Sequence, residues 1–140
     1  HYEISNYAKD GFRCKHNLKY WRNREYIGLG VSGYSYFNGR KYGNQKNIDE
    51  YLSDYSVKYI HGEIIDRENE MFEYAMMNLR LNDGISLDDY KNRFGTSFLD
   101  GRESLIDEMV RLGYMGVSDG RVYITDRGFY VSNTIMSSII

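Results

Sequence analysis

The sequence contains no proline and a single cysteine, Cys14. One thiol excludes a disulfide within the chain, and it cannot by itself hold an iron–sulfur cluster, which takes several thiolate ligands. No apolar run reaches the roughly 18 residues that a membrane-spanning helix needs. The first residues include neither an initiator methionine nor an apolar signal region. These absences predict a protein without a transmembrane segment, in the reducing cytoplasm.

Aromatic residues are abundant, and charge is unevenly distributed. Aromatic side chains make up 16% of the chain, with 15 tyrosines. Residues 1–60 contain ten Lys and Arg against six Asp and Glu, whereas residues 61–140 contain eight against fourteen. This asymmetry predicts two units with different partners, residues 1–62 and residues 63–140, with the boundary near His61 and Gly62.

A glycine-rich loop is predicted early in the first unit. Tyr26–Val31 is typical of a short buried strand that leads into this loop. Gly28, Gly30 and Gly33 have the spacing of a dinucleotide-binding loop, but the residues from Tyr34 onward are typical of a strand rather than a helix. A dinucleotide site is therefore not favoured.

A hairpin and a short helix follow the glycines. Ser35–Phe37 and Arg40–Tyr42 flank Asn38-Gly39, a pair that readily adopts the positive φ angles of a tight hairpin turn. Asn47 to Tyr55 predicts a short helix, with Asn47 as the N-cap and Glu50 three residues later.

Residues 63–140 predict three helices in succession. The apolar face of the first is expected to comprise Met71, Phe72, Ala75, Met76 and Leu79. Ser86 with Asp89 predicts a capping box for the second helix, which Gly95 ends. The third helix is marked by Leu105, Ile106, Met109, Val110 and Leu112, and Gly113 ends it.

A second hairpin and a last helix complete this unit. Asp119-Gly120 joins two strand-like runs, residues 114–118 and 121–125. Thr125 can cap a final helix whose expected buried residues are Phe129, Ile135, Met136 and Ile139. Three helices, a β-hairpin and a helix are the order of a winged-helix-like domain.

A winged helix raises the possibility of DNA binding through its third helix. The outward residues of that helix are expected to be Arg102, Glu103, Ser104, Asp107, Glu108 and Arg111. Phosphate binding needs a positive face, and this helix has at least as many acids as bases. The sequence therefore predicts no nucleic-acid partner, and a winged-helix regulator is the least favoured function.

Histidine and cysteine offer little for a metal site. Cys14 and His16 lie two residues apart and could share a zinc ion, but His1 and His61 are the only other histidines and neither has finger-like spacing. Cys14 is expected to be a small, partly buried apolar residue.

The segment from Lys15 to Arg22 combines the only tryptophan, a histidine and several cations. If the segment is helical, His16 and Tyr20 share a face. A flat anionic ligand such as haem or another porphyrin would use an imidazole for iron, aromatic rings for the macrocycle and cations for the propionates. The cations available are Lys15, Lys19, Arg22 and Arg24. The alternative is a histidine that caps a loop beside a Tyr/Trp core cluster. Residue types alone favour this alternative over a haem site.

Several motifs together resemble those of a known family. They are His1–Ala8 (HYEISNYA), His16–Trp21 (HNLKYW), Tyr26–Gly30 (YIGLG), Ile124–Gly128 (ITDRG) and Ser132-Asn133. Their order and spacing are similar to those of the oxygen-independent coproporphyrinogen III oxidase-like radical-SAM family, and His-Asn-x-x-Tyr-Trp resembles its haem-chaperone (HemW) branch. The resemblance covers nearly the whole chain.

This resemblance implies an α+β fold: the C-terminal part of a partial (β/α) radical-SAM barrel, with a crossing hairpin, followed by the winged-helix-like domain. It implies a parent protein that binds haem and delivers it to an acceptor protein. His16 would be the iron ligand, and Asn17, Tyr20 and Trp21 would complete the haem site. The alternative is an oxygen-independent coproporphyrinogen III oxidase of haem biosynthesis.

The resemblance also implies cofactors that this chain cannot hold alone. The [4Fe–4S] cluster and S-adenosylmethionine of the parent would use a three-cysteine motif expected before His1, so the chain itself is predicted to be inactive in radical chemistry. Gly28, Gly30 and Gly33 would form the cofactor-proximal glycine loop. The family often has Ala-His-Ser where this chain has Gly33-Tyr34-Ser35, and the role of that histidine is not transferred to Tyr34.

Overall fold

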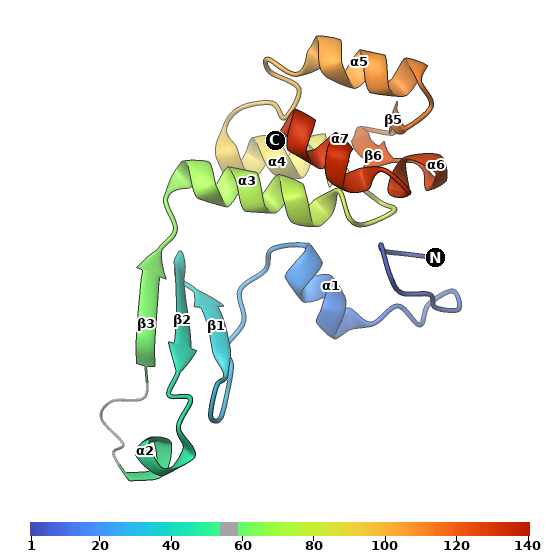
Figure 1. Cartoon of the computed structure of the whole chain (residues 1–140). Coiled ribbons are helices and arrows are strands. Elements are labelled where there is room, and N and C mark those ends of the chain that lie inside the picture. Colours follow the sequence, from blue (N-terminus) through green and yellow to red (C-terminus); the bar gives the residue numbers. More distant parts are fainter. Residues whose placement is uncertain (54–58) are drawn as a thin grey trace. The chain divides into compact units, whose positions relative to one another are not determined.

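The computed structural model describes residues 1–53 and 59–140, which divide into two compact units (Figure 1). One unit comprises residues 24–70, and the other comprises residues 1–23 together with 71–140. No helix in the described ranges is long and apolar enough to cross a membrane. The helices are α1 (Lys15–Trp21), α2 (Ile48–Ser53), α3 (Arg67–Asn78), α4 (Leu87–Phe94), α5 (Glu103–Arg111), α6 (Asp126–Phe129) and α7 (Ser132–Ile139). The strands are β1 (Tyr34–Phe37), β2 (Arg40–Asn44), β3 (Tyr59–Ile64), β4 (Ile85–Ser86), β5 (Met115–Ser118) and β6 (Arg121–Ile124).

The unit of residues 24–70 is built on an antiparallel sheet of order β1-β2-β3. Its β1–β2 turn has positive φ at both Asn38 (51°) and Gly39 (67°), so the predicted hairpin is confirmed. The Asn47 Oδ1 atom accepts hydrogen bonds from the backbone N–H groups of Asp49 and Glu50, at 2.9 and 3.2 Å, which confirms the predicted N-cap of α2. The predicted end of this helix at Tyr55 lies outside the described residues. Strand β3 was not predicted.

The predicted buried strand over residues 26–31 is wrong. Among the residues that the structure describes, only Tyr26 of this segment forms a β-bridge, which is antiparallel and with Tyr36. Ile27 and Leu29 are 60% and 87% exposed. Beyond Tyr26, the Ser35 hydroxyl and the Asn44 amide bond to backbone groups of Gly28 and Gly30 that a neighbouring strand would otherwise pair.

The other unit encloses an aromatic and aliphatic core. Its buried apolar members are Tyr74, Ala75, Leu79, Ile85, Tyr90, Phe94, Phe98, Ile106, Met115, Val122, Ile124, Ile135, Met136 and Ile139. The Tyr90 ring lies 4.8 Å from Phe94, 5.7 Å from Tyr74 and 5.4 Å from Phe98 between centroids, mostly edge to face. This geometry is the favourable one for aromatic pairs, and it joins α3, α4 and the segment before α5.

The predicted winged-helix order is confirmed in this unit. Ser86 Oγ accepts a hydrogen bond from the Asp89 N–H at the start of α4, and Gly95 ends the helix with φ of 68°. Asp119 and Gly120 have φ of 51° and 69° in the β5–β6 turn. Strand β4 joins this hairpin to give an antiparallel sheet of order β4-β6-β5.

Two details of the prediction are wrong. Phe72 is 45% exposed, because the buried face of α3 comprises Tyr74, Ala75 and Asn78 instead. The predicted last helix is divided into α6 and α7, since the backbone leaves the helical region at Val131 (φ −123°, ψ 21°). Thr125 caps α6 as expected, with its hydroxyl accepting from the Gly128 N–H.

The first 23 residues belong to the same compact unit as the winged-helix-like elements. Glu3 forms a bridge with Leu81, and the Ile4 N–H donates to the Arg80 carbonyl at 2.9 Å. Tyr2 and Glu3 are buried. The division into compact units therefore differs from the boundary predicted at residues 61–62, because N-terminal backbone groups pair with the turn after α3. The assignment of residues 1–62 to a barrel segment stays a prediction.

Candidate functional site

The candidate haem-binding segment forms α1, so the helix on which the predicted pairing of His16 with Tyr20 depends is present. The helix begins after Cys14 without a side-chain cap, and the N–H of Arg22 closes it by donating to the Leu18 carbonyl. None of the seven residues of α1 is buried. The helix thus presents its side chains at the surface of its unit instead of contributing to the core.

His16 and Tyr20 lie together on one face of α1. The His16 Nε2 atom is 3.0 Å from the Tyr20 hydroxyl oxygen, and the two rings meet edge to face at 4.8 Å between centroids. Both side chains are exposed, Tyr20 by 36%. The arrangement places an accessible imidazole beside a phenol ring. It is not the buried Tyr/Trp cluster of the alternative interpretation.

The structure does not bring Trp21 into this pair. The Trp21 indole is half-buried, and the Arg80 guanidinium lies 5.8 Å from its ring centroid. Five residues after His16, Trp21 lies away from the His16–Tyr20 face of the helix. Asn17 is half-buried as well. Of the four predicted haem-site residues, His16 and Tyr20 are therefore the two that the structure places in direct contact.

The cations predicted around this segment have different surroundings. Lys15 and Lys19 are exposed on α1 itself. Arg22 lies 3.5 Å from a carboxylate oxygen of Asp83. Arg24 belongs to the other compact unit. The two lysines are the cations on the helix that present their charge to solvent beside His16 and Tyr20.

The glycine loop of residues 28–33 is held by the side chain of Asn44. Its amide donates to the carbonyl oxygens of Gly28 and Gly30, at 3.2 and 2.8 Å, and the Gly28 N–H donates to Ser35 Oγ at 3.0 Å. A Cβ atom on Gly28 would lie 2.3 Å from the Tyr34 carbonyl oxygen. The close approach of the loop to β1 thus explains glycine at residue 28 without any ligand.

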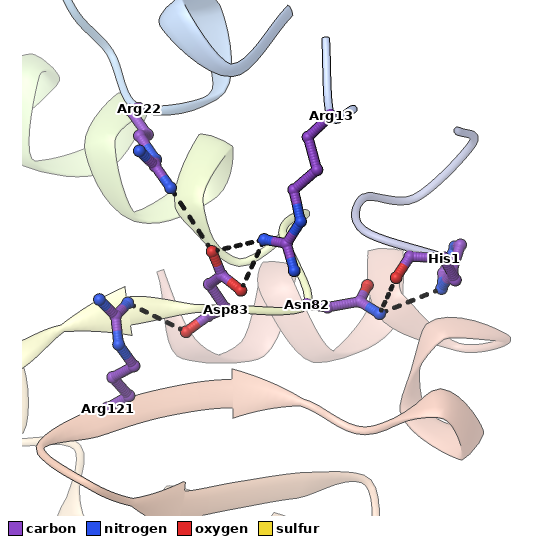
Figure 2. Close-up of polar contacts among 6 residues, drawn as sticks. All are labelled: His1, Arg13, Arg22, Asn82, Asp83 and Arg121. Carbon is purple, nitrogen blue, oxygen red and sulfur yellow. Dashed lines mark hydrogen bonds and ion pairs between the residues drawn. The ribbon is translucent and has the colours of Figure 1, made fainter. Parts of the chain in front are cut away.

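Sequence reasoning missed Asp83, which connects distant parts of its unit. Figure 2 shows its carboxylate receiving Arg13 and Arg22, while Arg121 donates to its carbonyl oxygen. The neighbouring Asn82 amide donates to the His1 carbonyl oxygen at 3.1 Å. The sequence signal at this place is the turn-forming run Asn82-Asp83-Gly84, which indicates a turn but not its partners.

The donor set of this chain does not fit an iron–sulfur cluster. A cluster needs several thiolates, and Cys14 is the only cysteine. Among the described residues, no three His, Cys, Asp or Glu side chains are grouped so that they could hold a metal ion. Cys14 itself is exposed, so the expectation that it is partly buried is wrong.

The predicted outward position of Arg102, just before the third helix α5, is wrong. Arg102 does not point outward: its Nε donates to the Ile139 carbonyl at 2.9 Å, and its guanidinium lies 5.2 Å from the Phe98 ring centroid. The exposed charges left on α5 are Glu103, Asp107, Glu108 and Arg111. This acid-rich face argues further against phosphate binding.

Comparison with known proteins relates this chain to the HemN and HemW proteins. Residues 65–131 match the family model of the HemN C-terminal domain. The chain is 30% identical to heme chaperone HemW of Lactococcus lactis over 141 residues, covering 100% of this chain and 37% of the relative. It is also 30% identical to heme chaperone HemW of Bacillus subtilis over 143 residues, covering 99% of this chain and 38% of the relative. The chain thus spans little more than a third of the length of these relatives.

A solved structure shares the fold. The likeness to coproporphyrinogen III oxidase (HemN) from Escherichia coli, a radical SAM enzyme, has a TM-score of 0.62 at 16% identity and covers 83% of this chain and 28% of that one. This likeness confirms the predicted α+β fold class. Residues 65–131 match the HemN C-terminal domain, and the whole chain is similar to heme chaperones named HemW, in agreement with the family resemblance of the sequence motifs.

Proposed function

We propose that this chain is a haem-binding part of a haem chaperone, in which His16 ligates the iron of the haem that the protein delivers to an acceptor. The observation that carries this proposal is the exposed His16 imidazole beside Tyr20 on α1. It is supported by relatives, named heme chaperone HemW, that match the whole length of the chain.

The residues around His16 fit a flat anionic ligand. An imidazole is a common axial ligand of haem iron. The Tyr20 ring offers an aromatic surface to the macrocycle, and the exposed ammonium groups of Lys15 and Lys19 offer partners to propionates. Nε2 is the outer nitrogen of the imidazole, so it is the atom that we assign to iron. Asn17 and Trp21 remain proposed members of the site at its half-buried edge.

The proposal assigns other chemistry to other residues of the longer protein. A [4Fe–4S] cluster and S-adenosylmethionine would be held by parts of the parent outside this chain, because Cys14 cannot supply the ligands alone. The glycine loop of residues 28–33 would lie near that cofactor. The role of this chain is then to bind and present haem, and not to perform radical chemistry.

Haem titration followed by the Soret band tests the proposal. His16→Ala should weaken haem binding at least about tenfold, because an axial ligand is lost. His1→Ala is the matched control, since it removes another exposed histidine of the same unit and should leave the affinity unchanged. Equal affinities of wild type and His16→Ala would remove the case for His16. Anaerobic conversion of coproporphyrinogen III by the longer protein would favour the oxidase interpretation instead.

A further inference from the structure

One carboxylate receives the arginines on both sides of α1. Arg13 lies just before the helix, and its Nη1 atom is 3.1 and 3.0 Å from the two carboxylate oxygens of Asp83. Arg22 directly follows Trp21, and its Nη2 atom is 3.5 Å from Oδ2 of the same residue. Figure 2 shows the two guanidinium groups converging on Asp83 from different segments of the chain. Both ends of α1 are thereby tied to a single side chain.

Asp83 itself is firmly fixed in the winged-helix-like unit. It lies in the turn between α3 and β4, where the Gly84 N–H donates to the Leu81 carbonyl at 3.0 Å. Its own carbonyl oxygen accepts from Arg121 Nη1 at 3.2 Å. The flanking residues Leu81 and Ile85 are fully buried. The carboxylate thus projects from a turn that the core holds in place.

The helix is short, and its side chains are exposed or half-buried. Seven residues are too few for a stable helix in water, and none of those in α1 is buried. Further contacts that tie the helix and its end to this unit include the Arg80 guanidinium over the Trp21 ring and the Arg93 Nη1 atom, which donates to the Asn23 carbonyl at 3.2 Å. Like those of Asp83, these contacts are made by charged groups.

We infer that Asp83 is the positioning residue of α1: its carboxylate holds Arg13 and Arg22 and so fixes the helix that bears the His16–Tyr20 pair. The part of this inference that concerns haem rests on the proposed function, whereas the attachment of the helix does not. The three side chains are 31–44% exposed, so salt screens their attraction. Removing the Asp83 charge also leaves Arg13 and Arg22 without their shared counter-charge.

Trp21 makes the attachment measurable, because it is the only tryptophan of the chain. Asp83→Asn should shift Trp21 emission to longer wavelength and make it more open to acrylamide quenching, and high salt should produce part of the same change in wild type. Asp107→Asn is the matched control, because it removes an exposed aspartate of α5 and should leave Trp21 unchanged. Arg13→Gln should change the Trp21 emission and quenching when it is introduced into wild type. It should cause no further change when it is introduced into Asp83→Asn. Wild-type quenching in Asp83→Asn would overturn the inference.

Haem titration of the same variants separates the inference from the proposed function. Asp83→Asn should weaken haem binding about three- to tenfold, the range expected for one or two partly exposed ion pairs, and Asp83→Glu should restore most of it. Unchanged haem affinity and unchanged Trp21 emission in Asp83→Asn, with wild type binding haem, would refute Asp83 as the positioning residue. A shifted Trp21 in Asp83→Asn, with no haem bound even by wild type, would refute the haem proposal and leave the attachment standing.

Discussion

The Nε2 atom of His16 lies 3.0 Å from the hydroxyl oxygen of Tyr20, one helical turn further along α1. This nitrogen is the one that we assign to haem iron, so the hydroxyl competes with the metal for it. Tyr20→Phe removes the competing hydroxyl and keeps the ring beside the macrocycle. Haem affinity should therefore increase about two- to fivefold, the value of one exposed hydrogen bond.

Soret titration of Tyr20→Phe beside wild type measures this effect. Tyr7→Phe is the control, because Tyr7 is an exposed tyrosine of the same unit and its hydroxyl is not bonded to His16. A weaker affinity in Tyr20→Phe would contradict the assignment, and would indicate that Tyr20 instead orients the imidazole while Nδ1 approaches the iron.

Gly84, beside Asp83, should tolerate no side chain. Its φ is +63°, and a Cβ atom there would lie 2.2 Å from the Val122 carbonyl oxygen. Gly101 has a similar φ of +76° but open space around the same position. Gly101→Ala should lower the free energy of unfolding by about 1–2 kcal/mol through backbone strain alone. Gly84→Ala should cost roughly 1–3 kcal/mol more, because the collision adds to that strain.

Urea unfolding monitored by circular dichroism compares the two glycine variants directly. The difference between them isolates the collision with β6, since both substitutions place alanine at positive φ. Equal losses of stability would mean that the turn moves away from Val122 without resistance, and Asp83 would then not be rigidly held.

The elements that sequence reasoning located correctly depend on residues close together in the chain. Ser86 caps α4 through a residue three positions away, and the two hairpin turns depend on the pairs Asn38-Gly39 and Asp119-Gly120. Such local interactions can be read from spacing and residue type alone. The same locality explains why the contact between His16 and Tyr20 could be anticipated once a helix was assumed.

What sequence reasoning missed depends on contacts between distant segments. Asp83 bonds to Arg13, 70 residues away, and to Arg22, 61 residues away. Tyr26–Val31 has the residue types of a buried strand, but most of the segment lacks a neighbouring strand among the described residues, and Asn44 binds the carbonyl groups of Gly28 and Gly30. Periodicity does not identify partners of this kind, because tertiary contacts override local preference.

Tyr74 should make the stability of the winged-helix-like unit fall at alkaline pH. Burial raises the pKa of its hydroxyl above the ordinary value of 10.0, the Asp89 carboxylate raises it further, and Arg93, Arg121 and Arg22 oppose the change. Below pH 10 the folded and unfolded states both keep this proton. Above it, the unfolded chain ionises first, so the free energy of unfolding falls as pH rises towards the folded-state pKa.

Urea unfolding at pH values from about 9 to 11 tests this linkage. Tyr74→Phe should show a shallower loss of stability over that range than wild type, because the group with the raised pKa is gone. Tyr130→Phe is the control, since Tyr130 is 91% exposed and its removal should leave the wild-type slope. Identical slopes in Tyr74→Phe and wild type would show that Tyr74 does not contribute.

The glycine loop of residues 28–33 should lose its conformation without the Asn44 amide. Asn44 is buried, and its Nδ2 donates to the carbonyl oxygens of Gly28 and Gly30. Asn44→Ala leaves both carbonyls without this donor and should cost roughly 1–3 kcal/mol of local stability. Asn44→Asp should cost more, because a carboxylate would face two carbonyl oxygens and repel them.

Hydrogen exchange of the amides in residues 28–33 should rise in the order wild type, Asn44→Ala, Asn44→Asp. Asn92→Ala is the control, because Asn92 is exposed on α4 and its loss should leave this exchange unchanged. Equal exchange in the Ala and Asp variants would mean that the loop keeps its shape through the Ser35 hydroxyl and the close packing of Gly28 on Tyr34, and that the Asn44 bonds are incidental.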